Sequence, residues 1–210
     1  MKFPLFASFI VFIIWLTYEL HKHSRIDESY DQAFWDREAL ANATRKKSLD
    51  ALSYITIPLE QLPMELCTEE EEIQDIHKTL LRLSKATIVN LTGFTNTELK
   101  LQYGAPNINR LTEYDQNYTL LVRTLQKWAS YLYQKNYLVE AKAILEFAVS
   151  TKTDVSSSYK LLADIYLAEG SFEKISDLIS IASTLNSAMK NTIVHTLQEF
   201  DLCSDSLHSS

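Results

Sequence analysis

The sequence contains few of the residues that interrupt helices or build turn-rich folds. Its 210 residues include 3 glycines and 4 prolines, which argues against an all-β fold, because such folds need frequent turns. Apolar residues make up 46% of the chain and charged residues 22%, so the composition is that of a globular protein rather than a disordered one. We therefore predict an all-α fold.

Cysteine and positive charge are also scarce. Cys67 and Cys203 are far apart and neither has a CxxC partner, which argues against a zinc site or a redox pair. They could form one disulfide in an oxidising compartment, but two free, mostly buried thiols are the favoured interpretation. A net charge of −7 at pH 7 argues against nucleic-acid binding, which needs a basic surface.

No motif of a known catalytic site occurs in the chain. GxSxG, P-loop and dinucleotide-binding patterns are absent, and the 5 histidines form no HxxxH or HExxH pair. We therefore predict no catalytic residues, no metal site and no cofactor, and an enzyme with an unrecognised site is the least favoured alternative. Three glycosylation sequons, at Asn42, Asn90 and Asn117, are short enough to arise by chance and decide nothing.

An uncharged apolar run extends from Phe3 to Tyr18. At about 1.5 Å per residue it would be roughly 24 Å long as a helix, and extension to Leu20 brings it close to the thickness of a hydrocarbon core. No small-x-small cleavage site follows the run, and a buried core helix would be amphipathic. We therefore predict a single-pass transmembrane anchor at residues 1–20, at the start of an otherwise helical chain.

Basic residues after the run predict its orientation. Lys22, Arg25, Arg37 and the run 45–47 outnumber Lys2 and the amino terminus, which favours a cytoplasmic C-terminal domain. Residues 21–50 are highly charged and are predicted to form a juxtamembrane helix or linker. The basic run 45–47 could contact anionic lipid, but a solvated face is the favoured interpretation.

Residues 51–110 are predicted to hold an extended segment and two helices outside any repeat. Pro58 and Pro63 exclude a helix or a central strand over residues 54–63. A capping box, Thr68 with Glu71, predicts the start of the first helix. Its apolar stripe follows helical spacing, with Ile73, Ile76, Leu80 and Leu83.

The second of these helices is also predicted from a capping box. Thr95 and Glu98 have the required spacing, and the helix is expected to run to about Tyr103. Gly104 and the residues after it are strong helix terminators.

A 34-residue repeat is the most informative pattern in the chain, since residues 122–155 superimpose on 156–189 with apolar residues in phase. The matched pairs are Trp128 and Leu162, Ala129 and Ala163, Leu132 and Tyr166, Asn136 and Gly170, Ala141 and Ile175, Leu145 and Ile179, and Ala148 and Ala182. This period is typical of helix–turn–helix units that bury their apolar faces by stacking.

The repeat predicts the elements of residues 111–200 in order. Helices are expected over 112–135, 138–151, 156–169 and 171–185, with Asp154 or Ser156 capping the third of them. A last helix over 186–200 has no match in the repeat and suits a terminal cap. Residues 201–210 are expected to be a disordered tail.

These positions resemble the tetratricopeptide (TPR) repeat, which has small residues where its two helices cross and a glycine in its turn. The resemblance covers about a third of the chain and has departures: Asn136 replaces the turn glycine, Ile175 replaces a small residue, and Thr153 and Ser187 stand at the closing proline. Because two units are fewer than usually stand alone, we expect the helices within 68–103 to complete the core. The whole layout also resembles single-pass membrane-anchored, TPR-containing proteins of anaerobic Gram-positive bacteria, a likeness that implies location but no activity.

The resemblance implies that a partner binds in a groove along the inner faces of the first helices. The residues at those positions are Arg123, Gln126, Ser130, Tyr133, Lys160, Asp164 and Leu167. Lys160 fits one position of the family's clamp for a peptide carboxylate, but Asp164 stands where asparagine is needed, so a carboxylate clamp is not expected. The alternative is that this face is simply solvated.

Together these patterns predict a membrane-anchored, non-enzymatic adaptor or scaffold that binds a protein or peptide. The alternative is an accessory or regulatory subunit of a membrane complex, with the anchor and the exposed pair Phe34-Trp35 forming the contact. The sequence identifies neither the partner nor the oligomeric state.

Overall fold

The computed structural model describes residues 3–208, except for the side chains of residues 3–7, 20–30 and 203–208. Over this part of the chain the regular structure is helical, which confirms the all-α prediction. The chain divides into two compact units. The first comprises residues up to Lys47 together with Thr95–Ile108, and the second comprises Ser48–Phe94 and the residues from Asn109 onward.

The first unit consists of α1 (Phe3–Ala43), α3 (Asn96–Tyr103) and the 3₁₀ turn η2 (Ala105–Asn107). The capping box predicted for α3 is confirmed, because the Thr95 side chain accepts from the amide of Glu98 and the Glu98 carboxylate accepts from the amide of Thr95 at 2.8 Å. α1 is one continuous helix through the predicted boundary at residues 20 and 21. The anchor and most of the juxtamembrane segment therefore belong to a single helix.

The apolar run lies in the first half of α1. Its described side chains are exposed, among them Phe9 (59%) and Trp15 (56%). Within the described residues, no helix has an apolar stretch that is long enough to cross a membrane. The predicted anchor extends over residues 1–20, and the side chains of residues 1–7 and of Leu20 lie outside the described part.

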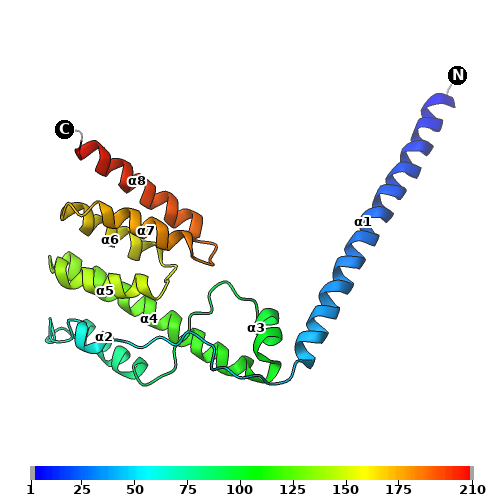
Figure 1. Ribbon diagram of the computed structural model, residues 1–210. Helices are drawn as coiled ribbons and strands as arrows, with labels where there is room; N and C mark the ends of the chain where they lie inside the picture. Colours follow the sequence, from blue (N-terminus) through cyan, green and yellow to red (C-terminus); the bar gives the residue numbers. More distant parts are fainter. Residues whose placement is uncertain (1–2, 209–210) are drawn as a thin grey trace. The chain divides into compact units, whose positions relative to one another are not determined.

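The second unit is a stack of helices (Figure 1). Its elements are η1 (Leu59–Gln61), α2 (Glu71–Leu83), α4 (Ile108–Gln134, from Asn109 onward), α5 (Leu138–Ser150), α6 (Ser156–Ala168), α7 (Glu173–Ser183) and α8 (Lys190–His208). In Figure 1 α2 covers one end of the layer made by α4 and α5, α6 and α7 form the next layer, and α8 covers the other end. The four predicted repeat helices are therefore present, with bounds that shift by a few residues.

α8 continues beyond its predicted end at Phe200 to His208. The predicted disordered tail at 201–210 thus falls on a helix as far as His208. α8 also continues the repeat pattern that the sequence comparison ended at residue 189. Ile193 and Leu197 are buried and lie 34 residues after Tyr159 and Ala163, so α8 occupies the position of a third first helix.

The predicted cap of α2 is wrong. The helix begins at Glu71 after Glu70, and no side chain caps it. Cys67 has a left-handed backbone with φ 55°, and its carbonyl accepts from the amide of Glu70 at 3.1 Å. This turn occupies the place where Thr68 would begin the helix, and the Glu70 carboxylate instead accepts a hydrogen bond from Tyr131 of α4.

The predicted cap of α6 is wrong for a related reason. Its N-cap residue is Val155, without a side-chain hydrogen bond. The carboxylate of Asp154 accepts from Ser187 Oγ at 2.7 Å, and Ser156 Oγ is buried without a partner. A tertiary contact has therefore recruited the side chain that local sequence assigned to the cap.

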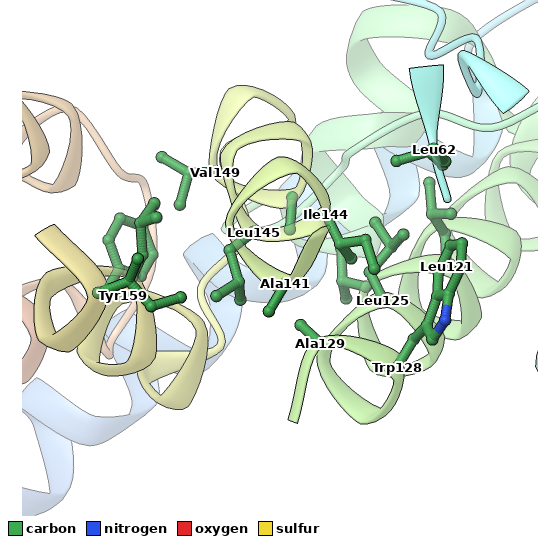
Figure 2. Close-up of a cluster of buried hydrophobic side chains, with 14 of the residues drawn as sticks. Leu62, Leu121, Leu125, Trp128, Ala129, Ala141, Ile144, Leu145, Val149 and Tyr159 are labelled. Carbon is green, nitrogen blue, oxygen red and sulfur yellow. The ribbon is translucent and has the colours of Figure 1, made fainter. Parts of the chain in front are cut away.

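The apolar residues predicted from the repeat form the core (Figure 2). In Figure 2 Leu121, Leu125 and Trp128 of α4 face α5, and Ala129 lies close to Ala141 where the two helices approach each other. Trp128, Ala129 and Ala141 are completely buried. Small residues at this crossing allow the two backbones to approach while the larger side chains fill the space beside it.

Residues before α2 and after it complete one side of this core. Tyr54 and Val89 form an isolated antiparallel bridge, and Ile57 and Leu62 are buried. The predicted extended segment at 54–63 is thus interrupted by η1, a single 3₁₀ turn that Pro58 permits because it precedes the first helical residue. The apolar stripe predicted on α2 is confirmed, since Ile73, Ile76, Leu80 and Leu83 are all buried.

The two turns within the repeat have the same backbone geometry. Asn136 and Gly170 both adopt the left-handed conformation, with φ 65° and 69°. The same two hydrogen bonds close each turn: Tyr137 N–H to Leu132 O and Asn136 N–H to Tyr133 O, both at 2.9 Å, and then Ser171 N–H to Tyr166 O at 2.8 Å and Gly170 N–H to Leu167 O at 3.1 Å. This is the Schellman motif, formed twice at a separation of 34 residues.

Candidate functional site

The candidate site is the face of α4 and α6 that carries the seven residues predicted to line a groove, here called the first-helix face. Arg123 and Lys160 are exposed, and the remaining five, which are Gln126, Ser130, Tyr133, Asp164 and Leu167, are half-buried. The first-helix face is therefore partly accessible along both helices. Its residues come from corresponding turns of two helices that hold the same register in the repeat.

Two of the predicted residues take part in a contact between the helices. Gln126 donates its amide N–H to Ser130 Oγ at 2.9 Å, and its Oε1 accepts from Ser158 Oγ of α6 at 2.5 Å. Ser158 is completely buried and was not among the predicted residues. Gln126 therefore fixes the spacing of α4 and α6, and less of its side chain remains for a partner.

Asp164 is the carboxylate of this face. Burial raises the pKa of Asp164, and the nearby ammonium of Lys160 opposes that rise without cancelling it. Within the described part of the chain no side chain donates a hydrogen bond to the Asp164 carboxylate. A partner that supplied a donor there would stabilise the charged form.

The exposed charges of the first-helix face are positive. In the described residues neither Arg123 nor Lys160 forms an ion pair, whereas neighbouring Lys127 pairs with Glu72 of α2 at 3.1 Å. Unpaired Arg123 and Lys160 therefore give this face a local basic character in a chain whose net charge is −7. Such a surface attracts acidic segments of a partner.

α8 adds positions to the first-helix face that sequence reasoning missed. Val194, Gln198 and Asp201 lie 34 residues after Lys160, Asp164 and Leu167, and α8 packs against α6. The signal that could have found them was the continued phase of Ile193 and Leu197. It was overlooked because the small residue Ala163 is followed by a leucine at the next equivalent position.

The described residues contain no group of three or more His, Cys, Asp or Glu side chains that could hold a metal ion. Cys67 is a free, half-buried thiol, and the side chain of Cys203 lies outside the described part. The first-helix face therefore offers hydrogen bonds, charge and an aromatic ring, which are the means of binding rather than of covalent chemistry.

Comparisons of the chain with models of known protein families, with curated proteins and with solved structures give no significant match. Interpretation of the first-helix face therefore rests on its own residues and on the repeat geometry.

Proposed function

We propose that this protein is a non-enzymatic interaction module in which a TPR-like stack binds a protein or peptide on the first-helix face. The observation that carries the proposal is the repeated backbone geometry, with the same Schellman turn at Asn136 and Gly170 and buried residues in phase through α4, α5, α6 and α7. Stacked helix pairs of this kind present long continuous surfaces, which are used for binding.

The charge of the first-helix face supports an acidic partner segment. Arg123 and Lys160 supply two unpaired cations, and Tyr133 and Leu167 supply half-buried apolar surface at equivalent positions of the two units. Aromatic and arginine side chains contribute most to interface energies, whereas exposed lysines act mainly through steering and specificity. A partner helix or strand with acidic residues beside an apolar one would complement this arrangement.

We further propose that residues 1–20 anchor the module in a membrane, with the stack on the cytoplasmic side. The uncharged run, the exposure of its described side chains from Phe9 to Leu16 and the basic residues after it support the proposal. Alkaline extraction of membranes tests the anchor, and protease protection of sealed vesicles tests the orientation. A chain released by alkali, or a stack protected inside vesicles made cytoplasmic side out, would contradict these two points respectively.

Site-specific photo-crosslinking in living cells tests the partner surface. A crosslinking amino acid placed at Tyr133 or Leu167 is expected to capture the same partner, because both positions lie on the first-helix face. The matched control is Val139, which is 66% exposed on α5 and lies off that face. Equal capture of the same protein from Val139 would refute binding by the first-helix face.

A second function is favoured by one feature of α1. Phe34 and Trp35 are 55% and 64% exposed, and their rings meet edge to face with centroids 5.3 Å apart. An exposed aromatic pair beside a membrane segment suits a contact with another membrane protein, as an accessory subunit would make. Replacement of both residues by serine should then release the chain from its complex while crosslinking from Tyr133 is unchanged.

A further inference from the structure

A polar cavity lies at the edge of the second unit where α5 and α7 end. Its volume is about 430 Å³, and its walls come from residues 53–55, Asn90, Thr92, and the segments 150–152 and 184–187. All of these residues belong to the same compact unit, and none is among the predicted groove residues. A cavity of this size is within the range of small-molecule sites, which begins at about 300 Å³.

Asn90 holds one wall of the cavity in place. Its side-chain amide donates to the carbonyl oxygens of Thr151 at 3.0 Å and Lys152 at 3.1 Å, and to the hydroxyl of Tyr118 at 2.9 Å. Lys152 has a left-handed backbone, with φ 60°. The turn that follows α5 is therefore fixed by a residue more than sixty positions earlier in the chain.

Gly93 allows the opposite wall to come close. A Cβ atom at this position would lie 2.1 Å from the carbonyl oxygen of Asn186, and φ is +87°. Only glycine tolerates both conditions, so the segment at 90–93 can lie directly against the segment after α7. The cavity is thus formed by held segments and does not require a ligand to assemble it.

Several polar side chains of the lining have no partner within the protein. In the described part of the chain, no hydrogen bond or ion pair involves the side chains of Ser53, Thr92, Lys152 or Asn186. Lys152 supplies the one charge among the described lining residues. Tyr54 adds an aromatic ring that is 49% exposed, held edge-on against Tyr114 with centroids 6.5 Å apart.

These features select one ligand chemistry. Hydroxyl and amide side chains that both donate and accept match a ligand with several hydroxyl groups. The exposed ring of Tyr54 matches the C–H face of a sugar ring, and the single ammonium of Lys152 matches a single carboxylate. We propose that this cavity is a binding site for an acidic sugar, a saccharide unit that carries one carboxylate.

Other ligand classes fit the cavity less well. A nucleotide or other polyphosphate needs more than one cation, and the carboxyl ends of α5 and α7 at the cavity place partial negative charge near it. An apolar ligand would leave the ammonium of Lys152 and the hydroxyls of Ser53 and Thr92 desolvated without a partner. The acidic sugar satisfies the cation, the hydroxyls and the ring together.

Titration of the full chain with three probes tests the proposal: D-glucuronate, D-glucose and acetate, followed by calorimetry and by saturation-transfer NMR of the sugars. Glucuronate is expected to bind about tenfold more tightly than either glucose or acetate. Lys152→Met should lower glucuronate binding about tenfold and leave glucose binding unchanged, whereas Thr92→Val should weaken both sugars. Lys85→Met is the matched control, since Lys85 is exposed, forms no ion pair in the described residues and lies outside the cavity.

Three results would overturn the proposal. The first is no binding of either sugar, and the second is acetate binding as tight as glucuronate binding, which would indicate a simple anion site. The third is an equal loss of glucuronate binding in Lys85→Met. None of these results bears on photo-crosslinking from Tyr133 or Leu167, so failure of the sugar site and failure of the proposed interaction module are distinguishable.

Discussion

The two repeat units, 122–155 and 156–189, share a backbone plan but differ in what covers them. The first is covered by α2 and the second by α8 (Figure 1). At the equivalent large core position the first unit has Trp128 and the second has Leu162, both completely buried. Trp128 meets the ring of His77 from α2 edge-on, with centroids 5.1 Å apart. The 34-residue period thus conserves turns and helix positions, while the covering helix sets the size of the side chain.

Truncation of this core position is expected to have the largest effect. Trp128→Ala should lower the free energy of unfolding by about 3–5 kcal/mol, because it opens a cavity against both α2 and α5. Leu162→Ala should cost about 2–5 kcal/mol and, as the smaller cavity, less than Trp128→Ala. Urea denaturation followed by far-UV circular dichroism measures both. A larger loss in Leu162→Ala would mean that α2 contributes little to the first unit.

Exchange of the residues at the helix crossing tests the units against each other. Ala141 and Ile175 occupy equivalent positions, and both are completely buried. Ile175→Ala should cost about 2–5 kcal/mol by leaving a cavity, and Ala141→Ile should cost about 1–3 kcal/mol by forcing α4 and α5 apart. Hydrogen exchange of the amides in each helix pair shows where the loss falls. If Ala141→Ile is neutral, the first crossing has unused space and the comparison in Figure 2 fails.

Acid should weaken the first unit more than the second. Burial lowers the pKa of His77, whereas an unfolded histidine titrates near about 6.5. The unfolded chain therefore takes up the proton first, so the free energy of unfolding is fully present above that pH and falls as the pH drops below it.

His77→Phe should reduce this loss between about pH 6.5 and 5, measured by urea denaturation at a series of pH values. His195→Phe on α8 is the control, because His195 is exposed and its side chain faces Glu199 at 3.6 Å. An unchanged acid dependence in His77→Phe would show that this ring is not the proton acceptor that matters.

The turns should give the smallest effects, of opposite sign in the two units. Asn136→Gly should stabilise by up to about 1 kcal/mol, because a residue with a Cβ atom pays for the left-handed backbone. Gly170→Ala should destabilise by about 1 kcal/mol, since nothing lies within 4 Å of an added Cβ atom and only the backbone conformation costs energy. Thermal denaturation resolves both shifts. Equal signs would show that the two turns differ in more than the residue at this position.

Sequence reasoning succeeded where a pattern was local or periodic. The capping box at Thr95 and Glu98 formed as predicted, and the spacing of the apolar residues identified the core of α2 and of the repeat helices. These features succeed because helix period and short-range capping depend on neighbouring residues in the chain.

Prediction failed where a distant residue competed for the same side chain. Asp154 was expected to cap α6 but accepts from Ser187, and the box at Thr68 was displaced by the turn at Cys67 while Glu70 bonds Tyr131. The cavity beside Lys152 was missed for the same reason. It is assembled by contacts between Asn90 and the turn after α5 and between Gly93 and Asn186, and no local pattern encodes such contacts.

The identical Schellman turns have a consequence for how such a chain could change in evolution. Because each turn sends the chain back in the same register, duplication of one whole 34-residue unit would insert a layer between existing layers and leave α2 and α8 covering the ends. An insertion of any other length would rotate the buried stripe out of phase. The length of the first-helix face is therefore free to vary in steps of one repeat, while its two ends remain under independent selection.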